Sequence, residues 1–372
     1  MNISRKKPHK PLRGAAGAES RYIKLKSDLE NDLFNKNWAE VDISHHIAKT
    51  PHYTSIDLFS GAGGLSCGLR QAGFKKLLSV EIDPDASATI RRNFPESKHY
   101  EGKIEDLNIH DILPDLKEVE LHLLAGGPPC QGFSVAGFRK KSDPRNSIVN
   151  YFLGVVKEYR PWTVLIENVP VILTLDNGGF KELIFQELKD AGYEVSVRIH
   201  EAADFGVPQL RTRAIFFANR FGLPNLYPIP TNTRSNYVPI EDAIRDLADL
   251  PPDPVINHEW TKHKAAMEER ISKVRPGGSL YETFRDAWKR QHMGVPSMAI
   301  KENHGGTHIH PWKDRVISAR EMARLQTFPD DFIFCGTMKR AMWQIGNAVP
   351  VRLGEVLGLA IRQTLNKCKK QM

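Results

Sequence analysis

A regular alternation of short apolar runs with amphipathic stretches, beginning near residue 53, constrains the fold most. TSIDLF is followed by GLSCGLRQAG, and KLLSVEI is followed by ASATIRRNF. The same rhythm continues through HLLAGG, SIVNYFLGVVKEY, WTVLIEN and FKELIFQELKDAG to RAIFFAN. Strand-length runs that alternate with helix-length stretches predict a mostly parallel sheet with helices on both faces. The sequence therefore predicts a doubly wound α/β domain over residues 53–220.

The composition changes after Arg220. Residues 221–315 include FGLPNLYPIPTNTRSNY and LPPDPVINHEW, and this Pro-, Asn- and Thr-rich texture is typical of a smaller, loop-rich module. Regular signals return over residues 316–372, where the last amphipathic helix is expected to pack into the core. We predict an N-terminal arm over 1–52, the domain over 53–220, the module over 221–315 and a C-terminal segment that returns to the first domain.

The positive charge of the chain is concentrated at its N-terminus. The net charge is +8, and residues 1–27 contain eight Lys or Arg against the single acidic residue Glu19. Such an arm is usually solvated and partly flexible, although it can add electrostatic attraction to DNA. The four cysteines form no CxxC pair, which argues against a zinc site, and no stretch is apolar enough for a membrane span. We therefore expect a cytoplasmic protein with reduced thiols and no metal.

A glycine-rich turn follows the first strand. In IDLFSGAGGLSCGL, Gly61, Gly63 and Gly64 allow backbone amides to approach a ligand at the start of a helix. Glu81 ends the next strand, close to the spacing at which an acidic residue binds ribose hydroxyls. The turn lacks the Lys-Ser/Thr ending of a P-loop and departs from GxGxxG. An adenosine cofactor without phosphates, S-adenosylmethionine, fits this pattern.

Three further segments place reactive side chains near strand ends. Cys130 ends LHLLAGGPPC, and Glu167 ends WTVLIE, so both are predicted to face the crevice at the carboxyl ends of the strands. A lone cysteine is more often a core residue, and a carboxylate at a strand end is often a helix cap or ion-pair partner. Arg211 and Arg213 lead into a strand on one face, either as a surface ion pair or as a guanidinium fork for a carboxylate or a base.

Together these motifs resemble a known family. DLFSGAGG, GGPPCQGFS, ENV, GVPQLRTR, REMARLQTFPDDF and QIGNAVPV, in this order, are similar to the ordered motifs of cytosine-5 DNA methyltransferases, and the resemblance covers residues 53–362. It implies the Rossmann-like sheet of S-adenosylmethionine-dependent methyltransferases with a second, smaller target-recognition domain. It also implies an enzyme that acts on double-stranded DNA.

The resemblance implies a role for each candidate catalytic residue. Cys130 would attack C6 of a flipped-out cytosine, and Glu167 would contact ring N3 and the exocyclic amino group. Arg213 would orient the base, and Arg211 would support this group. The module over 221–315 would read bases in the major groove, while the two domains clamp the duplex and the target base is extruded.

The resemblance also implies the cofactor contacts. They are Phe59, Ser60, Gly61, Gly63, Gly64, Glu81, Ile82, Pro128, Asn347 and Ala348. One position departs from the pattern, because EGKIEDL has Lys103 where many relatives have an acidic residue for the adenine amino group. Asp106 or a backbone acceptor could substitute.

Several alternatives stay open at this point. We expect a monomer of the restriction-modification type with a cognate endonuclease that acts separately. An RNA methyltransferase acting on transfer RNA shares the scaffold, and a silent DNA-binding relative has no chemical need for Cys130, Glu167 and Arg213 together. The interpretation as a nicotinamide oxidoreductase is supported only by the glycine turn and Glu81. The histidines of NHGGTHIHP (His304, His308 and His310) adjoin no cysteine or acidic cluster, so we predict a loop near DNA rather than a metal site.

Overall fold

The computed structural model describes residues 15–32, 34–44, 53–117, 119–129, 146–281, 288–302 and 308–371, and the statements below concern these residues. A seven-stranded sheet forms the centre, with strand order β4-β3-β2-β5-β6-β8-β7. Its strands are β2 (Tyr53–Leu58), β3 (Phe74–Glu81), β4 (Lys98–Glu101), β5 (Leu123–Gly126), β6 (Thr163–Asn168), β7 (Glu194–Glu201) and β8 (Thr212–Asn219). β8 pairs antiparallel with both β6 and β7, and the other pairs are parallel.

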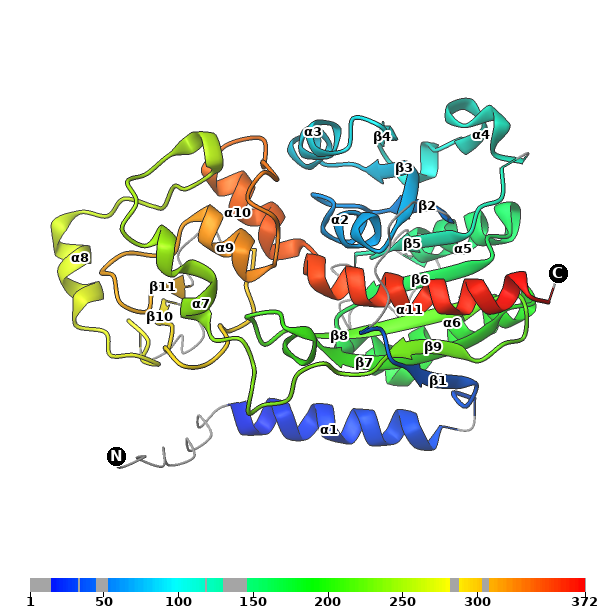
Figure 1. The fold of residues 1–372 in the computed structure, drawn as a ribbon, viewed down its shortest axis with the longest axis horizontal. Coiled ribbons are helices and arrows are strands. Elements are labelled where there is room, and N and C mark those ends of the chain that lie inside the picture. The colour runs from blue at the N-terminus through cyan, green and yellow to red at the C-terminus, as the bar shows by residue number, and fades with distance from the viewer. Residues whose placement is uncertain are drawn as a thin grey trace.

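Helices cover both faces of this sheet (Figure 1). α2 (Gly64–Gln71) and α11 (Val351–Lys369) pack against each other on one face, and α5 (Asn146–Tyr159) and α6 (Gly179–Asp190) pack on the other. α3 (Pro84–Asn93) and the short α4 (Ile109–Ile112) lie between sheet strands in sequence. The doubly wound α/β class and the core position of the last helix, both predicted from periodicity, are confirmed.

The strands alternate their side chains between two cores. Ile56 and Leu58 of β2 belong to the core under α5 and α6, whereas Leu123 and Ala125 of β5 belong to the core under α2 and α11. Such strands are buried on both faces, which is why their sequences are nearly continuous apolar runs rather than alternating ones. The carboxyl ends of β2, β3, β5 and β6 lie at the same edge of the sheet because these strands are parallel.

The second part of the chain lies at one end of the sheet (Figure 1). Its elements are α7 (Ile240–Ile244), α8 (Ala265–Ser272), β10 (Lys289–Arg290), β11 (His308–Ile309), α9 (Ala319–Leu325) and α10 (Met338–Asn347). A third core, which includes Ile244, Ile300, Met322 and Ile345, joins α7, α9 and α10. Single 3₁₀ turns occur at Ile104–Asp106, Pro114–Lys117, Pro170–Leu173, Leu175–Gly178, Ala202–Phe205, Arg245–Leu247 and Pro254–Ile256.

Part of the region that we predicted as an N-terminal arm packs on the sheet. α1 (Ala15–Asn31) contacts β7, and β1 (Trp38–Val41) pairs with β9 (Asn225–Pro228). Between them, the buried Asn35 side chain accepts a hydrogen bond from Val197 N (2.8 Å) and donates to Val197 O (3.0 Å). The amide thereby occupies backbone groups of an edge strand that would otherwise be open to another chain.

The contacts of β9 also bear on the boundary of the second module. The Tyr227 hydroxyl lies 3.1 Å from the Ser196 carbonyl oxygen, and Tyr227 belongs to the core under α11. We assigned β9 to the module that starts at 221, yet it packs on the central sheet and α11. These contacts favour a module that begins after Pro228.

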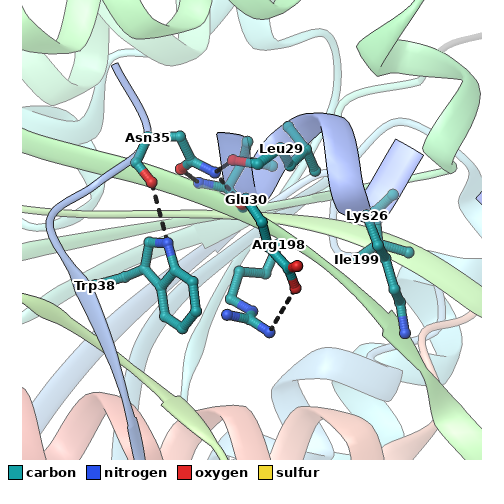
Figure 2. A pocket seen from close by; sticks show the side chains of 8 residues that line it. Lys26, Leu29, Glu30, Asn35, Trp38, Arg198 and Ile199 are labelled. Carbon is teal, nitrogen blue, oxygen red and sulfur yellow. Dashed lines mark hydrogen bonds and ion pairs between the residues drawn. The ribbon is translucent and has the colours of Figure 1, made fainter. Parts of the chain in front are cut away.

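A small pocket lies between α1 and β7 (Figure 2). The guanidinium of Arg198 stacks 3.6 Å from the centre of the Trp38 ring, and Lys26 and Glu30 line the rim. The pocket belongs to the packing of the N-terminal helix and not to the strand ends. Among the described helices, none is both long and apolar enough to cross a membrane.

Candidate active site

The glycine-rich turn connects β2 to α2, as its sequence predicts. Phe59, Gly61 and Gly63 have positive φ angles of 60°, 53° and 91°, so the chain reverses within a few residues. A Cβ at Gly61 would have no heavy atom within 4 Å, whereas a Cβ at Gly64 would lie 2.2 Å from the Val349 carbonyl oxygen. Gly61 therefore leaves its backbone open to a ligand, and Gly64 allows the C-terminal segment to approach the turn.

Glu81 lies beside this turn at the carboxyl end of β3. Its Oε2 accepts a hydrogen bond from Gly61 N (2.7 Å), and its Oε1 accepts from Ile82 N (2.9 Å) and Asp83 N (2.8 Å). Burial raises the pKa of Glu81, and these backbone donors oppose the rise. The side chain of Ile82 is 60% exposed next to it. A carboxylate and an apolar surface are thus placed together, as a ribose and an adenine ring require.

The C-terminal segment reaches the same place. Asn347 ends α10 and is exposed, while Gly346 and Ala348 on either side of it are buried. A Cβ at Gly64 would also lie 3.1 Å from the Ala348 Cβ. The predicted return of the end of the chain to the glycine turn is therefore present in the fold.

The GGPP segment continues from β5 between β2 and β6. A Cβ at Gly126 would lie 2.3 Å from the Leu58 carbonyl oxygen, so the strands could not approach with any larger residue there. Pro128 is buried, and its carbonyl accepts a hydrogen bond from Asn168 Nδ2 (2.9 Å). Cys130, the predicted nucleophile, lies outside the described residues.

Glu167 and Arg213 form an ion pair at the ends of β6 and β8. Arg213 Nε lies 2.6 Å from Glu167 Oε1, and both side chains are 12% exposed. Arg213 Nη1 donates to the Thr212 carbonyl (2.8 Å). A Cβ at Gly127 would lie 3.1 Å from Glu167 Oε2. One carboxylate oxygen is thus bound to the arginine, and the other faces the turn that leads to Cys130.

Arg211 is buried and has different partners. Its Nη1 donates to the Ile300 carbonyl (2.7 Å), and its Nη2 donates to the carbonyls of Gly346 and Ala348 (3.0 Å each). Burial and the nearby charge of Arg213 lower the pKa of Arg211. Because β8 begins only at Thr212, Arg211 does not continue the strand face of Arg213. The described hydrogen bonds of its guanidinium go to backbone carbonyls and not to a carboxylate.

Asp57 is a buried carboxylate below the turn that sequence analysis did not single out. Its Oδ2 accepts a 2.5 Å hydrogen bond from Ser66 Oγ in the first turn of α2, and burial raises the pKa of Asp57. The buried Lys76 amine lies 3.4 Å from the centre of the Phe94 ring, and burial lowers the pKa of Lys76. The signal in the sequence is a single acidic residue inside the apolar run TSIDLF.

Two weaker sequence predictions concern Lys103 and the histidines. Gly102 N donates to the Glu81 carbonyl (3.0 Å), which places Lys103 and Asp106, both exposed, in the segment beside the predicted ribose site. His308 lies 2.9 Å from Gln291 Nε2, and His310 Nδ1 accepts from Lys313 N (3.1 Å), so both ring systems are used in packing. The described part of the chain holds no group of three metal-ligating side chains, and His304 lies outside it.

Comparison with known proteins agrees with this geometry. The profile of the C-5 cytosine-specific DNA methylases matches residues 53–363, which is most of the chain. The chain belongs to this family. It is accordingly a DNA cytosine-5 methyltransferase, and DNA is its substrate.

Relatives of this methylase align over nearly their whole length. A type II methyltransferase of Haemophilus parahaemolyticus, M1.HphI, is 36% identical over 334 residues, which cover 86% of this chain and 89% of the relative. M.Eco47II, a type II methyltransferase of Escherichia coli, is 33% identical and covers 91% and 85%, respectively.

Solved structures show the same fold. The structure of a DNA modification methyltransferase encoded within an Escherichia coli prophage superposes with a TM-score of 0.71 at 27% identity, over 85% of this chain and all of that one. A DNMT2 from Spodoptera frugiperda superposes with a TM-score of 0.60 at 19% identity. The second similarity concerns the fold alone.

Proposed function

We propose that this methyltransferase transfers a methyl group from S-adenosylmethionine to C5 of a flipped-out cytosine in one specific sequence of duplex DNA, through a covalent bond between Cys130 and C6. The observation that carries the proposal is the Glu167–Arg213 ion pair, because the second carboxylate oxygen of Glu167 faces Gly127, in the turn that leads to Cys130. The glycine turn with Glu81 lies at the same edge of the sheet. The acidic group and the proposed cofactor site thus lie at one edge of the sheet, where β5 also ends before the segment that contains Cys130.

Cys130 would begin the reaction. Cytosine is a poor carbon nucleophile, and addition of the Cys130 thiolate to C6 moves an electron pair towards C5 and the ring nitrogen. A free thiol with a pKa near ~8.5 is only a few per cent ionised at neutral pH, so the thiol must lose its proton as the sulfur attacks. This covalent step divides a difficult alkylation into two easier ones.

Glu167 would stabilise the charge that this attack creates. Its carboxyl group would contact ring N3 and the exocyclic amino group of the base, while Arg213 holds the carboxyl in place through the 2.6 Å contact. Both side chains are largely shielded from water. Hydrogen bonds of fixed geometry in such a site stabilise a transition state more than they do in water.

The cofactor site fits S-adenosylmethionine. Glu81 would bind the ribose hydroxyls, Ile82 would cover the adenine, and the backbone of Phe59, Ser60, Gly61, Gly63 and Gly64, with Pro128, Asn347 and Ala348, would line the rest. The open space at Gly61 and the exposed amide of Asn347 support this assignment. When bound, the cofactor supplies an electrophilic methyl group. C5 accepts that methyl group, a base then removes the C5 proton, and elimination releases the Cys130 thiolate.

The biological setting forms part of the same proposal. The type II names of the relatives support a restriction-modification role with a cognate endonuclease that acts separately. We propose that the enzyme acts as a monomer and that the module after the sheet reads the bases.

At the cofactor site, we propose that Asp106 or a backbone acceptor contacts the adenine amino group, because Lys103 stands where many relatives have an acidic residue.

The decisive experiment measures methylation directly. Unmethylated genomic DNA and S-adenosylmethionine are incubated with the purified protein, and bisulfite sequencing maps 5-methylcytosine. Cys130→Ser and Glu167→Gln are run beside the parent protein. Cys335→Ser is the control, because the described hydrogen bonds of Cys335 are made by its backbone groups.

We expect methylation at one short motif, retained in Cys335→Ser and lost in Cys130→Ser. Glu167→Gln should lower the rate by about 10²- to 10³-fold, the usual effect of losing one charge-stabilising group. Absence of 5-methylcytosine after incubation with the parent protein would refute the proposal. Retained activity in Cys130→Ser would refute the covalent mechanism.

A further inference from the structure

Arg211 stands two residues from Arg213, yet its hydrogen bonds lead away from the base site. The guanidinium reaches the carbonyls of Gly346 and Ala348, which flank Asn347 in the proposed cofactor site. It also reaches the carbonyl of Ile300, which lies within the second module. Arg211 is only 4% exposed, so its guanidinium is bonded to these carbonyls and not to water.

A neighbouring side chain completes the same junction. Gln209 Oε1 accepts a hydrogen bond from Ile300 N (2.7 Å), and Gln209 Nε2 donates to Gln326 Oε1 (2.9 Å). Gln326 Nε2 in turn donates to the Ile345 carbonyl (2.8 Å). Both glutamines are fully buried. Gln209 and Arg211, which alternate along one segment, thus hold both backbone groups of Ile300 and the end of α10.

The residues on both sides of Asn347 are tightly packed. A Cβ at Gly346 would lie 2.4 Å from the Lys301 carbonyl carbon, and on the other side Ala348 lies against Gly64 of the glycine turn. A displacement of the Gly346–Ala348 segment would therefore displace Asn347 relative to the turn. Such a shift, even of about 1 Å, is enough to weaken a preorganised site.

We propose that Arg211 is a positioning residue of the cofactor site, which fixes Asn347 and Ala348 to the start of β8 and to the Ile300 segment of the second module. The inference rests on the proposed function, because it takes Asn347 and Ala348 as cofactor contacts. It assigns Arg211 to the binding of the methyl donor, while Arg213 serves the base. Two arginines that the sequence presents as a pair then have separate tasks.

The test measures cofactor affinity without catalysis. Binding of S-adenosylhomocysteine, the product form of the cofactor, is measured by titration calorimetry in the absence of DNA for the parent, Arg211→Met and Arg211→Lys. Lysine retains the charge but presents its donors from a single atom, so it cannot reproduce the planar fork. Duplex DNA binding by each variant is measured separately by fluorescence anisotropy.

A matched control is available in Arg320→Lys. Arg320 is also a buried arginine that donates to three carbonyls, those of Ile256, Pro329 and Phe332, but none of these belongs to the cofactor segment. Both substitutions should lower stability to a similar degree. Only the Arg211 substitutions should change cofactor binding in the folded protein.

We expect the Kd for S-adenosylhomocysteine to rise at least tenfold in Arg211→Lys, more in Arg211→Met, and less than twofold in Arg320→Lys, while the DNA Kd changes less than threefold. If Arg211→Met does not fold, Arg211→Lys decides. An unchanged cofactor Kd, or an equal rise in Arg320→Lys, would overturn the inference. If the parent protein itself fails to bind S-adenosylhomocysteine, the proposed function fails first.

Discussion

Gly68 offers a sharp test of how α2 and α11 are packed. A Cβ at this position would lie 2.3 Å from the Val351 carbonyl oxygen, 2.5 Å from Glu355 N and 2.6 Å from the Gly354 carbonyl carbon. All three atoms belong to the backbone of α11, so no side chain can rotate away. The helices must separate for Gly68→Ala to be accommodated.

The size of the effect follows from these distances. Ordinary carbon contacts begin at 3.4 Å, so α2 and α11 would have to move apart by about 1 Å at this crossing. Overpacking of this kind costs about 1–3 kcal/mol, and the cost falls at the upper end because backbone atoms are involved. The gain in helix propensity from Gly to Ala recovers at most about 1 kcal/mol. We expect a net destabilisation of about 2 kcal/mol.

Gly154→Ala is the matched control. Gly154 is an exposed residue inside α5, and a Cβ there would have no heavy atom within 4 Å. The same substitution should therefore stabilise the protein by about 0.5–1 kcal/mol. Urea unfolding of the two variants, followed by circular dichroism, compares their midpoints with that of the parent. A Gly68→Ala midpoint equal to or above the parent value would refute the close approach of the two helices.

Two other predictions concern buried charge and pH. Glu321→Gln should lower the free energy of unfolding in urea by about 3–5 kcal/mol, because it removes the buried negative charge that accepts two hydrogen bonds, of 2.7 and 2.8 Å, from Arg315. Burial raises the pKa of Glu321, but Arg315 and His310 outweigh this effect and hold the pKa at about 2. Recovery of stability in the double variant with Arg315→Met would identify the unpaired charge as the cause, and an unchanged stability in Glu321→Gln would contradict the prediction. Burial lowers the pKa of His122 and of His308 to about 4, so the folded protein binds fewer protons than the unfolded chain, whose histidines titrate near ~6.5. The free energy of unfolding should therefore be highest above pH 6.5 and should decline as the pH falls towards 4, by about 2 kcal/mol per histidine at pH 5. A free energy of unfolding that stays constant between pH 7.5 and 5 would count against neutral buried imidazole rings.

The central sheet could be predicted from the sequence because its signal is local. Apolar runs of strand length alternate with amphipathic stretches, and each strand end carries its own candidate residue. This was enough to place Glu81 beside the glycine turn, because parallel strands end at one edge of the sheet. The pairing of Glu167 with Arg213 depends instead on β8 running antiparallel beside β6.

Features that depend on distant partners could not be predicted in the same way. Arg211 and Arg213 look equivalent in QLRTR, and only the positions of Ile300 and Ala348, about 90 and 140 residues away, separate their roles. The edge-strand contact of Asn35 likewise depends on Val197. Neither partner leaves a signal in the local sequence. Charge and composition indicated a flexible arm for residues 1–52, although part of that region packs on the sheet.

Glycines of the sequence motifs also have a packing role, because they lie against backbone from other parts of the chain. Gly64 of the glycine turn packs on Val349, Gly126 of the GGPP segment packs on Leu58, and Gly346 packs on Lys301. In each case the small residue belongs to a motif that was identified through its resemblance to a catalytic family. These glycines contribute by letting segments that are separate in the sequence meet within van der Waals distance, which a Cβ would prevent. The site therefore depends on the end of the chain as much as on the strand ends that carry Glu81 and Glu167, because Asn347 takes its place only when α10 and α11 are packed.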